Sequence, residues 1–191
     1  VRALRADRVT LELEPGGGRV RVVAGGGEYW LHTYAAEDFP RLPAVDPERV
    51  FDVAAATWSA TLDPVIRAAS KDESRPVLTG VLVHVEPGRL TMAATDSYRL
   101  AVKETVLEDP VPEPLEAIVP ARALVEVQRL VGGGGAVSLA VEENHVAFGI
   151  DGVWLTARRI HGQFPNFRAL IPETFDHEVR LPLDEARDVV R

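Results

Sequence analysis

Ala94-Thr95-Asp96-Ser97-Tyr98-Arg99-Leu100-Ala101 joins two short segments in which the side chains alternate, 90–93 before it and 100–103 after it. A period of two on both sides predicts two strands joined by a tight corner. The short oxygen-bearing side chains of Thr95, Asp96 and Ser97 suit such a corner, because they accept hydrogen bonds from nearby backbone N–H groups.

The exit of this corner carries an aromatic, a planar cation and an aliphatic residue in succession: Tyr98, Arg99 and Leu100. Aromatic and arginine side chains are enriched where proteins bind partners, so the corner is a candidate binding site. The alternative is a structural corner in which Arg99 caps a carbonyl group and Tyr98 packs on the core.

Patterns on either side of the corner predict an α+β domain with two helices packed on antiparallel sheets. Apolar residues at helical spacing from Trp58 to Ala69 predict a first helix, with Pro64 either kinking or starting it. A second helix is expected to open at Pro120 and end at the glycine run 132–135. Alternating or β-branched segments predict strands at 51–53, 78–85, 89–94, 99–106, 117–119, 136–141, 145–150 and 153–159.

The chain shows an internal repeat with a period near 125 residues. A three-strand meander over 9–34 ends in Phe39-Pro40, and three strands over 136–159 end in Phe164-Pro165, 125 positions later. Such a period indicates repeated whole domains, although two similar hairpins could coincide by chance. The predicted organisation is the C-terminal part of one domain with a linker, one complete domain, and the start of a third, over 1–45, 46–172 and 173–191.

Composition and spacing argue against enzyme chemistry. The chain of 191 residues has no cysteine, which excludes disulfides and thiolate sites and fits a reducing cytoplasm. No apolar run approaches the roughly 18 residues that a membrane span needs, and no signal peptide is visible. The five histidines lack metal-ligand spacing. We therefore predict no catalytic residue, no metal and no cofactor.

Basic residues on the two predicted helices are candidates for a nucleic-acid surface. Arg122 and Arg129 lie opposite an apolar stripe, and Arg67 and Lys71, four positions apart, share a face of the first helix. The net charge of −8 argues against a uniformly basic surface but leaves room for a local basic face. Spacing alone favours the alternative, two ordinary solvated helix faces.

Three segments resemble the bacterial DNA polymerase III beta subunit family, the sliding clamps, in order and spacing: 95–101, 72–81 and 164–168. The resemblance implies a non-catalytic processivity factor that tethers the replicative polymerase to duplex DNA, as a head-to-tail homodimeric ring. This chain lacks most of the ring-closing surfaces of that family, so we expect it to be monomeric or only weakly associated. Alternatives are a clamp paralogue that binds partners or an antibiotic without supporting replication, or a small hydrolase using Asp96, Arg99 and a histidine.

The resemblance also implies site residues and partners. Helices lining the ring would bring Arg67, Lys71, Arg122 and Arg129 to double-stranded DNA without reading its sequence. Short peptides of the polymerase III catalytic subunit, the clamp loader and repair polymerases would dock in a hydrophobic pocket. Its residues here are Leu78, Thr95, Ser97, Tyr98, Arg99, Leu100, Pro165, Ala169 and Leu170. Ser97 replaces a glycine of some members, Ala169 replaces a frequent basic residue, and a further wall would come from late in a third domain.

Overall fold

The computed structural model describes residues 6–39, 45–108, 111, 113–132 and 134–190. The chain divides into two compact units, Val1–Pro43 and Ala44–Arg191. The predicted linker at the end of 1–45 and the glycine run 132–135 fall partly outside the described residues. None of the described helices is long and apolar enough to cross a membrane.

The first unit is an antiparallel three-strand meander, as the sequence predicts, in the order β1 (Val9–Leu13), β2 (Arg19–Ala24) and β3 (Gly27–His32). Gly25 and Gly26 adopt positive φ in the turn between β2 and β3, which glycine does at little cost. One face of the sheet is polar, because the Arg21 guanidinium contacts the carboxylates of Glu12 and Glu28 at 2.9 and 2.8 Å. The other face is apolar. A short 3₁₀ turn, η2 (Ala36–Asp38), follows.

The second unit contains two four-stranded antiparallel sheets. One has the strand order β7-β6-β5-β8 and the other β11-β10-β9-β4. The strands of the first are β5 (Gly80–Glu86), β6 (Arg89–Thr95), β7 (Leu100–Val106) and β8 (Leu115–Pro120). Those of the second are β4 (Phe51–Ala54), β9 (Ala136–Val141), β10 (His145–Ile150) and β11 (Val153–Arg158). All the pairings are antiparallel, which confirms the predicted α+β class.

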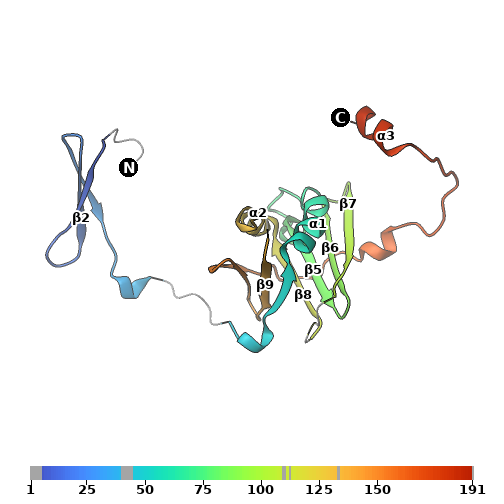
Figure 1. Ribbon diagram of the computed structural model, residues 1–191, viewed down its shortest axis with the longest axis horizontal. Coiled ribbons are helices and arrows are strands. Elements are labelled where there is room, and N and C mark those ends of the chain that lie inside the picture. The colour runs from blue at the N-terminus through green and yellow to red at the C-terminus, as the bar shows by residue number, and fades with distance from the viewer. Residues whose placement is uncertain (1–5, 40–44, 109–110, 112, 133, 191) are drawn as a thin grey trace. The chain divides into compact units, whose positions relative to one another are not determined.

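Two helices, α1 (Ala55–Ile66) and α2 (Ala121–Leu130), lie side by side against these sheets (Figure 1). Their apolar faces form the core, where Trp58, Leu62 and Leu124 are fully buried. The Trp58 ring meets the Phe148 ring edge-on at a centroid distance of 5.6 Å. Pro64 does not start α1; it lies inside its last turn, and the helix ends two residues later. The start of α2 at Ala121 is one residue past the predicted Pro120.

The prediction that Arg67 and Lys71 share a helix face is wrong. Arg67 is the C-cap of α1, and Lys71 lies in the loop that leads to the 3₁₀ turn η4 (Pro76–Thr79). The helix ends here because backbone groups at and after its last turn form hydrogen bonds with residues outside the helix. The Ser70 N–H donates to the Leu78 carbonyl at 2.8 Å, and the Arg99 guanidinium donates to the Arg67 carbonyl at 2.7 Å.

The segment after β11 returns to the first sheet of this unit. The Ile160 N–H donates to the Ile118 carbonyl at 2.8 Å, forming an isolated antiparallel bridge. Gly80 permits this close approach, because a Cβ added there would lie 2.5 Å from Cγ2 of Ile118. Beyond the bridge, the 3₁₀ turn η5 (Phe167–Leu170) carries Phe167, which is buried against the same sheet. Residues 160–170 are thereby brought to the corner between β6 and β7.

The β-strand register refines the internal repeat. Val22 pairs with Tyr29 in the first unit, and Phe148 pairs with Leu155 in the second. If Val22 corresponds to Phe148, then Tyr29 corresponds to Leu155, and both pairs are 126 positions apart instead of the 125 that separate the two Phe-Pro pairs. The one-residue difference matters, because neighbouring residues of a strand point to opposite faces of the sheet.

The remaining described helices of the second unit are η3 (Pro47–Arg49) and α3 (Leu183–Val189), and α3 has no buried residue.

Candidate functional site

The corner between β6 and β7 is closed by its own side chains. The Thr95 hydroxyl accepts the Ser97 N–H at 3.1 Å and donates to the Arg99 carbonyl at 2.8 Å. One carboxylate oxygen of Asp96 accepts the N–H groups of Tyr98 and Arg99, each at 3.0 Å. The predicted bonding of turn side chains to backbone N–H groups is confirmed for Thr95 and Asp96, whereas the Ser97 hydroxyl accepts a hydrogen bond from the Arg75 guanidinium. Ser97 has φ of 80°, a left-handed conformation that glycine adopts more easily.

Arg99 and Tyr98 separate the two interpretations of the corner. The Arg99 guanidinium contacts the Asp96 carboxylate at 3.1 Å and donates to the Arg67 carbonyl, so Arg99 does cap a carbonyl group. Tyr98, however, is 96% exposed and does not pack on the core. A rigid aromatic ring held in solvent by a well-ordered turn is available for contact with a partner.

A pocket of about 350 Å³ opens beside the corner. Its walls come from η4, the corner and the segment around η5, and eight of the nine predicted pocket residues line it: Leu78, Thr95, Ser97, Tyr98, Arg99, Leu100, Pro165 and Leu170. Phe164 and Phe167 anchor the last wall, because both are buried and their rings meet edge-on at 6.4 Å. The structure therefore brings three distant segments of the sequence together.

Ala169 is the predicted pocket residue that does not line this space. A 3₁₀ turn has three residues per turn, so Phe167 and Leu170 fall on one side of η5 while Ala169 falls between them. Leu170 itself is 63% exposed, which leaves most of its side chain free for contact.

Arg75 is a residue that the sequence did not single out. Its guanidinium donates to the Ser97 hydroxyl at 3.1 Å and to the Asp72 carboxylate at 3.1 Å, which ties the segment before η4 to the corner. The signal available was its place in the 72–81 motif, between Asp72 and Pro76.

Three of the four predicted DNA-facing residues surround one groove. Arg67, Lys71 and Arg122 line a space of about 700 Å³ between the end of α1 and the start of α2, with Val125 and Ile160 among its apolar walls. One acidic residue, Glu73, also lines this space, so the three cations outnumber a single carboxylate. Arg129 is not among its lining residues. Its guanidinium contacts the Glu126 carboxylate one turn earlier on α2, at 2.6 Å. Three of the predicted DNA-facing side chains therefore lie around this groove and not along the whole exposed face of α2.

The Asp96 carboxylate has a lowered pKa. The main cause is the hydrogen bond from the Arg99 backbone N–H, followed by that from the Tyr98 N–H, with a further contribution from the Arg99 charge. Asp96 is therefore ionised at neutral pH and unsuited to act as a general acid, which counts against the hydrolase alternative. Within the described part of the chain, no group of three or more His, Cys, Asp or Glu side chains is placed to hold a metal ion.

Acid should weaken the corner through Asp96. Because its folded pKa lies below the unfolded value, its stabilisation is present above about pH 3.9 and is lost as pH falls through the folded pKa. Asp96→Asn keeps an acceptor oxygen but has no charge to lose. We expect this variant to show a smaller fall in Tm between pH 7 and pH 3 than the wild type, measured by circular dichroism. Asp63→Asn, at an exposed position of α1, is the control, and identical falls for wild type and Asp96→Asn would contradict the assignment.

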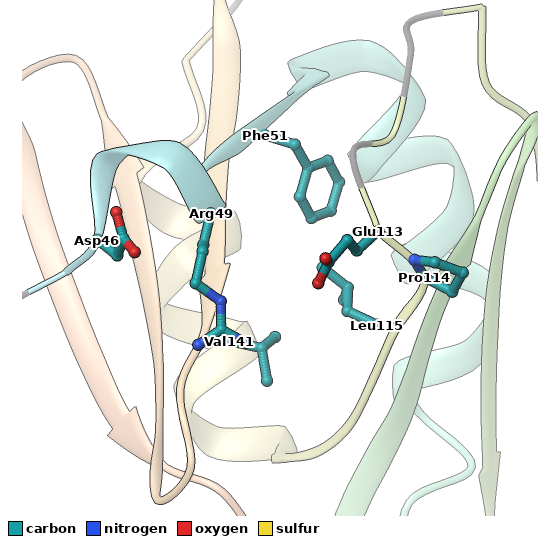
Figure 2. Close-up of a pocket in the computed structure, with 7 residues that line it drawn as sticks. All are labelled: Asp46, Arg49, Phe51, Glu113, Pro114, Leu115 and Val141. Atoms are coloured by element: carbon teal, nitrogen blue, oxygen red, sulfur yellow. The ribbon is translucent and has the colours of Figure 1, made fainter.

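A third cavity lies elsewhere in this unit. It has a volume of about 460 Å³, and Figure 2 shows the seven residues around it. Arg49 lies just before β4, Phe51 is the first residue of β4, and Glu113 lies on the segment that leads into β8. The Arg49 guanidinium contacts the Glu142 carboxylate at 3.3 Å. None of the predicted site residues lines this cavity.

Two curated relatives of this chain are beta sliding clamps. The beta sliding clamp of Synechococcus elongatus is 33% identical over 171 residues, which are 87% of this chain and 46% of that protein. That of Streptomyces coelicolor is 33% identical over 172 residues, again 87% of this chain and 46% of the relative. The chain thus spans about half the length of the curated relatives it matches.

Solved structures agree with the fold. The crystal structure of the Bacillus subtilis DNA polymerase sliding clamp has a TM-score of 0.74 and 26% identity, covering 87% of this chain and 44% of that one. A Pseudomonas aeruginosa sliding clamp bound to griselimycin has a TM-score of 0.72 and 25% identity, covering 88% and 45%. The architecture is that of the clamp fold. Residues 53–166 match the family model of the DNA polymerase III beta subunit, central domain, and the chain belongs to that family.

Proposed function

We propose that the protein acts as a DNA sliding clamp, a non-catalytic processivity factor that tethers the replicative DNA polymerase to duplex DNA in the cytoplasm. The observation that carries this proposal is the pocket of about 350 Å³, whose walls come from 78, 95–100 and 165–170. Membership of the beta subunit family supports it. The assembly we propose for this function is a head-to-tail homodimeric ring.

The pocket suits a short peptide. Leu78, Leu100 and Leu170 offer apolar surface, while Tyr98 and Arg99 lie at the rim, where Asp96 holds the Arg99 guanidinium in place. Burying one leucine or phenylalanine of a partner contributes about 1.5–3 kcal/mol, part of which is offset by ordering the peptide. We infer micromolar affinity at best for peptides of the polymerase III catalytic subunit, the clamp loader and repair polymerases.

The test is a titration with a labelled peptide of about ten residues, containing one glutamine followed by two or three bulky apolar residues. Fluorescence anisotropy should give saturable binding that is abolished by excess unlabelled peptide. Griselimycin, which is bound to the Pseudomonas aeruginosa clamp, serves as a second competitor. Absence of saturation at millimolar protein would contradict the proposal.

The basic groove suits double-stranded DNA. Arg67, Lys71 and Arg122 surround it, and contacts from such side chains to phosphates set affinity without reading sequence. A net charge of −8 on the whole chain makes the binding local and weak, because the rest of the surface repels DNA.

Removing Arg122 should lower the salt dependence of DNA binding. Each lost phosphate contact reduces the slope of log K against log salt concentration by roughly 0.9. We expect this reduction for Arg122→Ala and a smaller one for Arg129→Ala, because Arg129 already contacts Glu126. The measurement is anisotropy of a labelled duplex of about 20 base pairs at several salt concentrations. Arg89→Ala, at the start of β6, is the control. An unchanged slope for Arg122→Ala would mean that Arg122 does not contact DNA and belongs to an ordinary solvated surface.

A further inference from the structure

The loop between α1 and η4, residues 67–75, belongs to both candidate sites. It carries Arg67 and Lys71, which line the basic groove. Three hydrogen bonds tie the same loop to residues of the peptide pocket: Arg99 Nη2 to the Arg67 carbonyl at 2.7 Å, the Ser70 N–H to the Leu78 carbonyl at 2.8 Å, and Arg75 Nη1 to the Ser97 hydroxyl at 3.1 Å. The two sites are therefore connected through a segment of nine residues.

Two pocket residues, Ser97 and Arg99, contact the loop through their side chains, and of these Arg99 reaches the end of α1. Its Nε contacts the Asp96 carboxylate at 3.1 Å, while its Nη2 caps the carbonyl at the C-terminal end of α1. A cation at this end of a helix also interacts favourably with the helix dipole. The planar guanidinium makes both contacts at once through its fixed fork of donors, which a lysine ammonium cannot reproduce.

We propose that Arg99 is a positioning residue that couples the two sites, so that a peptide in the pocket strengthens DNA binding at the groove. The Arg99 guanidinium already contacts the Arg67 carbonyl, and a peptide that packs against the exposed Arg99 side chain shields this contact from water and stabilises it. The loop is then already ordered when Arg67 and Lys71 meet a phosphate, so the cost of ordering is met once for two binding events. By linkage, DNA strengthens peptide binding by the same factor. The inference rests on the proposed clamp function.

The test compares affinities for a labelled duplex of about 20 base pairs, with and without peptide at saturation. In the wild type we expect the peptide to tighten DNA binding about fivefold, at the low end of ordinary coupling between sites. Arg99→Lys keeps the charge but loses the fork, and its DNA affinity should change less than twofold on adding peptide. Arg89→Lys is the matched control, because Arg89 is also ion-paired, to Glu86 and Glu104, but lies at the other end of β6; it should behave as the wild type.

Hydrogen exchange provides a readout that does not depend on DNA. The N–H groups of Ala68 and Ala69 donate to the carbonyls of Val65 and Ile66 at the end of α1. Peptide alone should slow exchange at these two amides in the wild type and in Arg89→Lys, but not in Arg99→Lys. Independent binding of peptide and DNA would overturn the coupling and leave the clamp function standing. Coupling that survives in Arg99→Lys would overturn the role of Arg99, and failure of either ligand to bind would overturn the proposed function together with this inference.

Discussion

Trp58→Ala should lower the free energy of unfolding by about 3–5 kcal/mol, the usual cost of truncating a large buried aromatic side chain. Trp58 is fully buried in α1 and meets Phe148 of the second sheet edge-on. Its removal leaves a cavity where the helix layer joins a sheet, and close-packed surroundings refill such a space only in part. Urea denaturation followed by circular dichroism measures the change, because the described α-helices all belong to the Ala44–Arg191 unit.

Two further variants separate packing from other effects. Trp58→Phe keeps most of the aromatic volume and removes the indole N–H, which has no hydrogen-bond partner in the described structure. It should therefore cost less than about 1.5 kcal/mol. Trp154→Ala removes the same side chain from a position that is 45% exposed, and its cost should stay near 1 kcal/mol. Equal losses for Trp58→Ala and Trp154→Ala would contradict this description of the core.

Leu170→Ala should weaken peptide binding at least tenfold, equivalent to about 1.4 kcal/mol. Leu170 lines the pocket and is 63% exposed, so its truncation removes contact with the peptide while leaving the folded chain almost unchanged. Leu100→Ala should have a similar effect on binding. Because Leu100 also packs on the cluster around Phe164 and Phe167, it should in addition lower the stability of the chain. Isothermal titration calorimetry gives the affinity, and circular dichroism the stability.

The matched control is Val153→Ala, which truncates another exposed apolar side chain, on β11 and outside the pocket. Its affinity for the peptide should equal that of the wild type. Three indistinguishable affinities for Leu170→Ala, Leu100→Ala and Val153→Ala would mean that the peptide binds elsewhere.

Local patterns predicted most of the fold. The alternation around the corner predicted β6 and β7, and the helical spacing of the apolar residues Trp58, Leu62 and Val65 predicted α1. The end of α1 escaped prediction because the groups that cap it are distant in sequence: Arg99 reaches the Arg67 carbonyl across 32 positions. The predicted strand 78–85 is also wrong at its start, because Leu78 lies in η4 and β5 begins at Gly80.

The candidate site could be predicted only in part from the residues themselves. Residue chemistry alone did not decide whether Arg99 and Tyr98 form a structural corner or a binding site. The list of pocket residues came from the resemblance to the clamp family. Spacing could not exclude Ala169, because its displacement from the pocket depends on the 3₁₀ geometry of η5. Arg75 escaped because its contact with Ser97 spans 22 positions.

Amide chemical-shift mapping of the isotope-labelled chain during titration with the peptide tests whether the pocket beside the corner is the peptide site. We expect the largest shifts at Ser97–Leu100 and at Phe167–Leu170, two segments that line the pocket. Shifts centred instead on Arg49, Phe51 and Leu115, around the cavity of Figure 2, with the corner unchanged, would contradict it.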